Sequence, residues 1–489
     1  MKKSIKCLCV IVMAVFFLVG CGANKDNKKN EEKVKLDPEN PVSIRVWHYY
    51  NGSQQAAFDA LVNEFNSTKG KELGINVEGI SQGTVSDLAK TISDSIDGKV
   101  GAEKLPNIFS SYADTAYYAQ QKGKLVDLSE YFSKKELEKY VDSYIEEGYL
   151  KNDKALYLFP VAKSTESLMI NKTDWEPFAK QTGSSLDELK TIEGVVRVAK
   201  RYYEWTDAKT PNKPNDGKAF YGRDSMANYF VIGMKQLGKD IFEVEDGNVK
   251  FNIDKKLIKR LWKNYYVPYI DGYFTALGKF RSDDVKTGDL LAYTGSSMSA
   301  MYFPDKVEDD DKSYDIDYKV LPAPIMSGGE NYKVQQGADM AVTKSDKKHE
   351  YASCVFIKWF TQKEQNLQFV CESAYMPVLK SANNVKALED IIEKKSLNIN
   401  NKTYDCLKNV MGDFDNTKYY TTKNFENGSS ARDVLETNLS SKAQKDRKEV
   451  EKALAKGMKR TEVIKKYTTE EAFDKWYGEF CDALSNSLK

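Results

Sequence analysis

The start of the folded body alternates between strand and helix patterns. Residues 42–47 and 75–80 alternate apolar and polar side chains, which predicts strands, and residues 106–111 form a third short strand pattern. Apolar side chains at helical spacing predict helices over residues 53–65 and 85–96. This alternation predicts an α/β fold whose parallel sheet carries helices on its faces, with ligands at the carboxyl ends of the strands.

The rest of the chain has a different pattern. Residues 185–300 look mostly helical, and residues 440–489 form charged helices with one apolar face. That face consists of Val450, Leu454, Met458, Ala472, Trp476 and Phe480. A chain of 489 residues is long enough for two or more domains with substantial cores.

The N-terminus has the features of a secretory signal. Residues 1–6 are lysine-rich, and residues 7–19 are an apolar run too short to cross a bilayer, which needs about 20 residues. The run ends in Leu18-Val19-Gly20-Cys21, which resembles the bacterial lipobox, where the cysteine receives a diacylglycerol. Residues 22–40 are almost entirely polar, as in a solvated tether. We therefore expect signal cleavage after residue 20 and a lipid anchor on Cys21; the alternative is an ordinary signal peptide with an incidental cysteine.

Charge and aromatic content narrow the function classes. The net charge is +1 with both signs interspersed, whereas a nucleic-acid-binding surface needs a basic patch, so we expect no nucleic-acid partner. Aromatic residues make up 12% of the chain and include 30 tyrosines. Tyrosine offers a flat apolar face and a hydroxyl, which suits sugar-binding and other mixed-polarity sites.

The cysteines of the body fit no metal motif. Cys354, Cys371, Cys406 and Cys481 are too widely spaced for a zinc ribbon. Export would permit disulfides, but four cysteines in so long a chain are more typical of buried thiols.

Enzyme motifs are missing from the sequence. The two histidines, His48 and His349, cannot supply a histidine-rich metal cluster, and no zinc-protease or serine-hydrolase motif is present. Residues 233–240 resemble a phosphate-binding loop only superficially, since Asp240 stands where Ser or Thr would hold magnesium. Carboxylate pairs for glycoside cleavage stay possible among 72 acidic residues, but no local motif favours one.

Seven sequence blocks, in order, resemble the extracellular solute-binding proteins of ABC importers, the group that includes maltose-binding and glycerol-phosphate-binding proteins. The blocks are residues 46–50, 105–108, 123–128, 156–172, 291–297, 337–361 and 373–378. Asn107 replaces the usual Asp of the second block, and the fifth block lacks its usual aromatic residue.

The resemblance implies a two-lobed periplasmic-binding-protein-like fold of type II, with hinge crossovers and a helical C-terminal segment. The first lobe would comprise residues 41–162 and 336–400, and the second lobe residues 163–335 and 401–489. It further implies a monomer without enzymatic activity, cofactor or metal, which binds a small molecule and delivers it to ABC permease subunits. With the lipid on Cys21, the protein would sit on the outer face of the cell membrane, and a Gram-positive host fits this arrangement.

The carboxyl ends of the first three predicted strands supply candidate ligand-binding residues. The aromatic side chains of Trp47, Tyr49 and Tyr50 could stack on a polyol or pack in the core. Gln82 follows the second strand, and Tyr112 and Asp114 follow the third. Asp114 could accept two sugar hydroxyls or simply cap the following helix.

Further candidates rest on the resemblance. It places ligand-facing polar groups at the first crossover and small or polar groups at later loops and crossings. These candidates are Ser164, Thr165, Glu166, Tyr229, Ser296, Ser297, Gly337, Asp339 and Tyr375.

Arg432 lies in a segment, residues 425–435, that resembles the glycerol-phosphate-binding branch, where an arginine meets phosphate. The alternative is a helix-start arginine paired with Asp433 or Glu436.

The expected ligand is a carbohydrate, a sugar or an oligosaccharide, because aromatic and carboxylate-rich loops suit neutral polyols. The alternative within the same class is glycerol 3-phosphate or a glycerophosphodiester, favoured by Arg432. Alternatives of other classes are an extracellular polysaccharide-acting enzyme and a surface sensor or adhesion protein.

Overall fold

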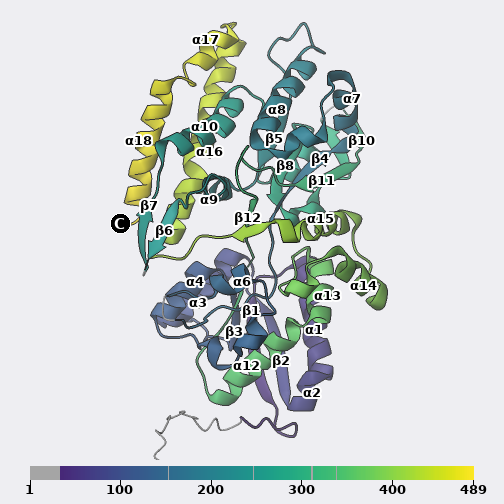
Figure 1. Ribbon diagram of the computed structural model, residues 1–489, viewed down its shortest axis with the longest axis vertical. Helices are drawn as coiled ribbons and strands as arrows, with labels where there is room; N and C mark the ends of the chain where they lie inside the picture. The colour runs from purple at the N-terminus through teal and green to yellow at the C-terminus, as the bar shows by residue number, and fades with distance from the viewer. Residues whose placement is uncertain (1–33, 152–153, 246, 310–311, 338) are drawn as a thin grey trace, which may run out of the picture. The chain divides into compact units, whose positions relative to one another are not determined.

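A four-stranded sheet forms the centre of the first lobe (Figure 1). β1 (Val42–His48) pairs in parallel with β2 (Ile75–Ser81) and β3 (Ile108–Ser111), and β13 (Asp339–Val342) joins antiparallel to β3. Helices α1 (Gly52–Ser67), α3 (Val85–Asp97) and α4 (Ala113–Gln121) follow the three parallel strands in turn. The predicted strand–helix alternation is confirmed.

The computed structural model describes residues 34–151, 154–245, 247–309, 312–337 and 339–489. Residues 36–489 form one unit, and residues 1–35 a separate one. The predicted signal peptide, Cys21 and most of the tether lie outside the described residues.

The second lobe is built on a mixed sheet of order β11-β4-β8-β5. β4 (Glu166–Asn171) is antiparallel to both β11 (Tyr318–Pro322) and β8 (Leu290–Ser296), and β8 is parallel to β5 (Ala219–Arg223). The prediction that residues 185–300 are mostly helical is wrong for the strands in this region. Those strands are short segments between amphipathic helices, so the helical period dominates the local pattern.

Helices surround the second sheet. α8 (Ile192–Asp207), α9 (Met226–Gln236) and α10 (Lys255–Ile270) pack with the C-terminal helices α16 (Gly428–Ala455) and α18 (Glu470–Asn486) into one apolar core. Of the predicted C-terminal face, Val450, Trp476 and Phe480 are buried. Met458 is 41% exposed, because α16 ends before it and no longer holds it on that face.

Two chain crossings lie side by side between the sheets. The backbone of Ser164 bridges that of Gln336, and β12 (Tyr332–Val334) pairs in parallel with β14 (Lys418–Tyr420). Farther along the chain, α14 (Val385–Lys395) packs on α13 (Lys363–Ser373), whereas α15 (Asn401–Gly412) packs on β11 of the second sheet.

The remaining elements are shorter or peripheral. Three thiols, those of Cys354, Cys371 and Cys406, are buried as predicted, and Cys481 is half-buried. Among the described residues, every helix is too short or too polar to cross a membrane. The other helices and strands are α2 (Lys69–Leu73), α5 (Lys134–Leu137), α6 (Asp142–Glu147), α7 (Lys172–Thr182), α11 (Arg281–Lys286), α12 (Lys347–Phe360), α17 (Arg460–Lys465), β6 (Phe242–Glu245), β7 (Asn248–Phe251), β9 (Lys306–Asp309) and β10 (Lys312–Asp315).

Candidate functional site

A polar cleft of about 200 Å³ lies where the first turn of α16 meets the start of α4 and the crossing at residues 334–336. Residues of both lobes line it, so a solute there would touch both. Three of the predicted ligand-binding residues, Tyr112, Asp114 and Arg432, come together in it. Its other polar lining residues are Glu147, Gln335, Gln336, Thr421, Thr422, Lys423, Asn424 and Ser429.

Arg432 projects from the second turn of α16, and its Nη2 donates a hydrogen bond of 2.6 Å to Asn228 Oδ1. The acid one turn along the helix, Glu436, is engaged elsewhere. Its Oε2 accepts from Ser225 Oγ at 3.1 Å and from the backbone N of Ala227 at 2.8 Å, at the start of α9. Within the described ranges Arg432 has no carboxylate partner, so the alternative pairing with Asp433 or Glu436 is wrong.

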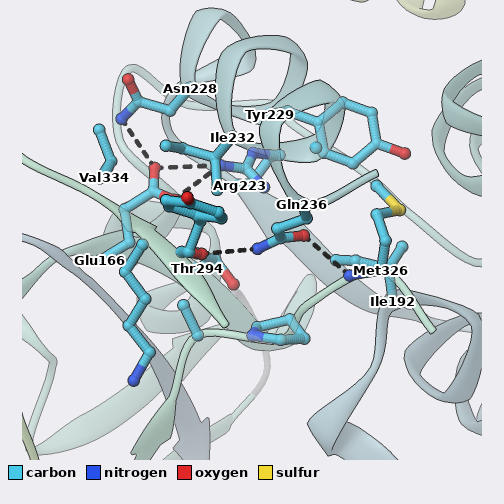
Figure 2. Close-up of a pocket in the computed structure, with 15 residues that line it drawn as sticks. Glu166, Ile192, Arg223, Asn228, Tyr229, Ile232, Gln236, Thr294, Met326 and Val334 are labelled. Atoms are coloured by element: carbon cyan, nitrogen blue, oxygen red, sulfur yellow. Dashed lines mark hydrogen bonds and ion pairs between the residues drawn. The ribbon is translucent and has the colours of Figure 1, made fainter. Parts of the chain in front are cut away.

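Glu166, another predicted site residue, is bound by buried partners beside a smaller cavity (Figure 2). Arg223 Nη2 donates to both of its carboxylate oxygens, at 3.0 and 2.9 Å, and Asn228 Nδ2 donates to Oε1 at 2.9 Å. Burial is the largest single influence on the pKa of the Arg223 guanidinium and lowers it, but the charge and hydrogen bonds of Glu166, together with Tyr221 and Tyr229, raise that pKa overall. The adjoining cavity of about 20 Å³ holds no more than about one water molecule.

A second buried ionic group lies at the crossings. Lys163 Nζ is 2.8 Å from Glu147 Oε2 and 2.7 Å from Asp339 Oδ1, and Gln335 Nε2 donates to Glu147 Oε2 at 2.5 Å. Two acids thus share one lysine. Burial raises the pKa of Asp339 to about 7; Lys163 opposes this shift and Glu147 adds to it.

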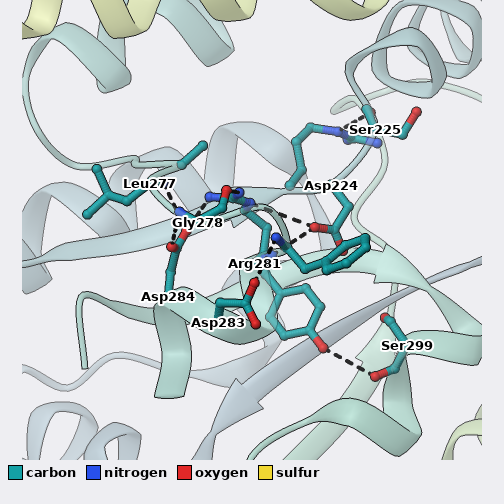
Figure 3. A network of polar contacts seen from close by, with 12 residues as sticks. Asp224, Ser225, Leu277, Gly278, Arg281, Asp283, Asp284 and Ser299 are labelled. Atoms are coloured by element: carbon teal, nitrogen blue, oxygen red, sulfur yellow. Dashed lines mark hydrogen bonds and ion pairs between the residues drawn. The ribbon is translucent and has the colours of Figure 1, made fainter. Parts of the chain in front are cut away.

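A third ionic group braces the loop after α10 (Figure 3). The backbone N of Arg281 donates to Asp224 Oδ1 at 2.9 Å, and its guanidinium pairs with Asp284. Asp284 also accepts from the backbone N of Gly278 at 2.6 Å. Burial raises the pKa of Asp224 to about 6. These contacts hold the segment that follows β5 beside the start of α11.

The aromatic candidates of the first lobe are buried. Trp47, Tyr50 and Tyr375 are at most 2% exposed, and Tyr49 is 8% exposed. The ring of Tyr50 packs against Phe369, and the hydroxyls of Tyr49 and Tyr375 are 2.9 Å apart. In this structure their faces are covered by protein, as expected of core packing at a strand end.

The other predicted residues lie around the crossings or away from the cleft. Ser164, Thr165, Ser297 and Asp339 are buried, and Ser296 pairs with Glu166 in the second sheet. Gly337 has φ +103°, and a Cβ there would lie 2.7 Å from the carbonyl oxygen of Ala162, so only glycine fits. Gln82 is half-buried at the end of β2. Tyr229 is buried in the second core, where its hydroxyl donates to the carbonyl oxygen of Leu261 at 2.8 Å.

Sequence reasoning missed several residues of the site. Arg223 ends a strand of the second sheet, and the strand-end rule would have pointed to it had β5 been recognised. Lys163 stands beside the predicted crossover residues. Asn228 and Glu147 lie inside helices, and nothing in their local sequence marks them.

The fold and the two-sided cleft define a two-lobed solute-binding protein of the kind that serves ABC importers. The chain belongs to the bacterial extracellular solute-binding proteins, whose family profile matches residues 60–397. Proteins of this family bind solutes and are not enzymes.

Solved structures share the fold along nearly the whole chain at low sequence identity. The cyclic α-maltosyl-1,6-maltose binding protein of Arthrobacter globiformis has 18% identity and a TM-score of 0.62, covering 92% of this chain and 99% of its own. UgpB of Mycobacterium tuberculosis, in complex with glycerophosphocholine, has 15% identity and a TM-score of 0.60, covering 90% and 99%. The ABC substrate-binding protein Lmo0181 of Listeria monocytogenes, in complex with cycloalternan, has 14% identity and a TM-score of 0.61, covering 91% and 100%. No curated protein sequence matches the chain.

Proposed function

We propose that this protein captures a phosphate-bearing polyol, of the glycerol 3-phosphate or glycerophosphodiester class, and delivers it to an ABC permease. The observation that carries this proposal is Arg432, a cleft arginine without a carboxylate partner among the described residues. Guanidinium groups bind phosphate through paired, charge-assisted hydrogen bonds. Gly428 and Ser429, in the first turn of the same 28-residue helix, also line the cleft, and the dipole at this end of the helix favours an anion.

A neutral carbohydrate is the second candidate. Tyr112, Asp114 and Gln336 line the same cleft and could hydrogen-bond sugar hydroxyls. The carbohydrate prediction relied partly on aromatic rings that could stack on a sugar. Trp47 and Tyr50 are buried among other side chains, so they support it less well.

Capture by lobe closure follows from a cleft lined by both lobes. A solute that contacts both lobes only when they are closed shifts the equilibrium by its differential affinity for the closed state. We place the lobe boundaries between residues 162 and 163, 335 and 336, and 400 and 401. The packing of α14 with α13, and of α15 with β11, supports the last of these.

We further propose that Cys21 carries a diacylglycerol that holds the protein on the outer face of a Gram-positive cell membrane. The lipobox-like ending and the polar tether support this. A palmitate analogue fed to expressing cells should label the wild-type protein but not Cys21→Ala, which should be released into the medium. If the wild-type protein were not labelled, the lipid anchor would be excluded and residues 1–20 would be an ordinary signal peptide.

A thermal-shift screen of the full chain tests the ligand class. A ligand at about 100 times its Kd stabilises the folded state by about 2.7 kcal/mol. We expect glycerol 3-phosphate or glycerophosphocholine to raise the melting temperature and maltose to leave it unchanged. A response to maltose alone would establish the carbohydrate candidate, and no response to any solute would favour a sensor or adhesion role.

A further inference from the structure

We propose that Asn228 makes the cleft selective for an anionic solute, by fixing the Arg432 guanidinium through contacts that lead back to the buried Glu166–Arg223 pair. The inference rests on the proposed function, since it concerns how the same cleft recognises its solute. Asn228 is a positioning residue here: it acts through Arg432.

The charges on both sides of the Asn228 amide determine its orientation. Glu166 can only accept hydrogen bonds, so the Nδ2 group of Asn228 faces Oε1, 2.9 Å away. Arg432 can only donate, so Asn228 Oδ1 faces Nη2, 2.6 Å away. A turned amide would set N–H groups against the guanidinium and an oxygen against the carboxylate, so a single orientation satisfies both contacts.

The Glu166–Arg223 pair gives this arrangement a rigid base. The side chains come from the same end of one sheet, on either side of β8: Glu166 starts β4, Arg223 ends β5, and each residue is 7% exposed. Arg223 Nε also donates to the carbonyl oxygen of Ser225 at 2.8 Å, and the guanidinium lies 5.1 Å from the centre of the Tyr229 ring. Arg223 neutralises the charge of Glu166. Asn228 therefore fixes the position of the Arg432 guanidinium without linking it to a net negative charge.

The two helices that carry Asn228 and Arg432 are tied together independently. Glu436, on the same face of α16 as Arg432, binds the start of α9 through Ser225 and Ala227. This contact sets the spacing between the helices and removes the acid that could otherwise neutralise Arg432. A neutral amide at position 228 therefore leaves the positive charge of Arg432 available to a solute, whereas an aspartate would cancel it.

Isothermal titration of the full chain with glycerophosphocholine, glycerol 3-phosphate and maltose tests the inference. The variants are Asn228→Ala, Asn228→Asp, Arg432→Ala and the Asn228→Ala/Arg432→Ala pair. Asn264→Ala is the matched control, because Asn264 also donates to a glutamate, Glu193, that binds an arginine, Arg260, outside the cleft lining. Melting curves of each variant separate loss of binding from loss of folding.

We expect Asn228→Ala to weaken binding of the phosphate compounds about tenfold, as loss of a charge-assisted contact does. Asn228→Asp should weaken it further, and Asn264→Ala should have no effect. In the Arg432→Ala background the Asn228→Ala effect should disappear, because the residue acts through Arg432. A purely structural role would weaken binding equally in both backgrounds.

The possible failures are distinguishable. If Arg432→Ala binds phosphate compounds as tightly as the wild type, or if the wild type binds none, the proposed function fails and the inference with it. If Arg432→Ala weakens binding while Asn228→Ala and Asn228→Asp do not, only the inference is overturned. The same holds if the Asn228→Ala effect persists without Arg432.

Discussion

The two lobes end their sheets near the cleft with different chemistry. In the first lobe, aromatic rings occupy the ends of the strands: Trp47 and Tyr50 are buried, and Tyr375 stacks on Phe369, which also contacts Tyr50. In the second lobe, charges fill them, with Glu166 paired to Arg223 and Asp224 held by Arg281. Apolar contacts are non-directional, so rings can cover one another in many arrangements. Each buried charge needs its own charged or hydrogen-bonding partner, because an unpaired charge is costly to bury. A charged cleft residue without a carboxylate partner is therefore a candidate for binding a ligand.

The largest effect should come from breaking the ionic end of the second sheet. Glu166→Ala leaves the buried Arg223 without its carboxylate, which should lower the free energy of unfolding by about 3–5 kcal/mol. Urea denaturation measures this. Replacing both partners with apolar residues, Glu166→Leu with Arg223→Met, should cost far less. A single variant as stable as the wild type would mean that the pair does not stabilise this lobe.

A pH profile probes the crossings, where one lysine serves two acids. Asp339 has a pKa of about 7 in the folded protein, above its ordinary value of 3.8. Between these values the folded state binds more protons than the unfolded state, so the contribution of Asp339 to stability is lost as pH rises toward 7. Melting curves from pH 4.5 to 7.5 should show the wild type losing stability relative to Asp339→Asn, whose Lys163 still pairs with Glu147. Parallel profiles would contradict this.

The smallest effect should come from the aromatic end of the first sheet. Tyr375→Phe removes the hydroxyl that contacts Tyr49 and keeps the ring packing, so it should cost about 1 kcal/mol of stability. Solute affinity, measured by titration calorimetry, should not change. A large loss of affinity with normal stability would show that the tyrosine hydroxyls reach the solute and that the two lobes share recognition more evenly.

Local periodicity predicted the first sheet because each of its parallel strands is followed by a helix of clear amphipathic pattern. It failed over β5 and β8, because their residues are almost all buried on both faces and do not alternate between apolar and polar. The strand-end rule led to Tyr112 and Asp114, which do line the cleft. The same rule selected Trp47 and Tyr50, whose packing partners, such as Phe369, lie some 300 residues away in the chain and cannot be identified from local sequence.

The family resemblance identified Arg432 as a candidate ligand-binding residue. Only the tertiary structure shows that Arg432 is not paired with Glu436. Glu436 stands four residues away on the same helix, where an ion pair would be the ordinary expectation. Instead, the Glu436 carboxylate accepts a hydrogen bond from the backbone N of Ala227, at the start of α9. Asn228 could not have been predicted, because an asparagine inside a buried helix gains its role only from the two charged groups that the tertiary structure brings to it.

The most direct test of the central claim is the affinity of the full chain for glycerophosphocholine, measured by titration calorimetry with and without Arg432→Ala. The claim predicts that the wild type binds and that the substitution weakens binding about 10- to 100-fold, as loss of a charged hydrogen-bonding partner does, with an unchanged melting temperature. Equal affinity of the two proteins, or binding of maltose and not of the phosphodiester, would contradict it.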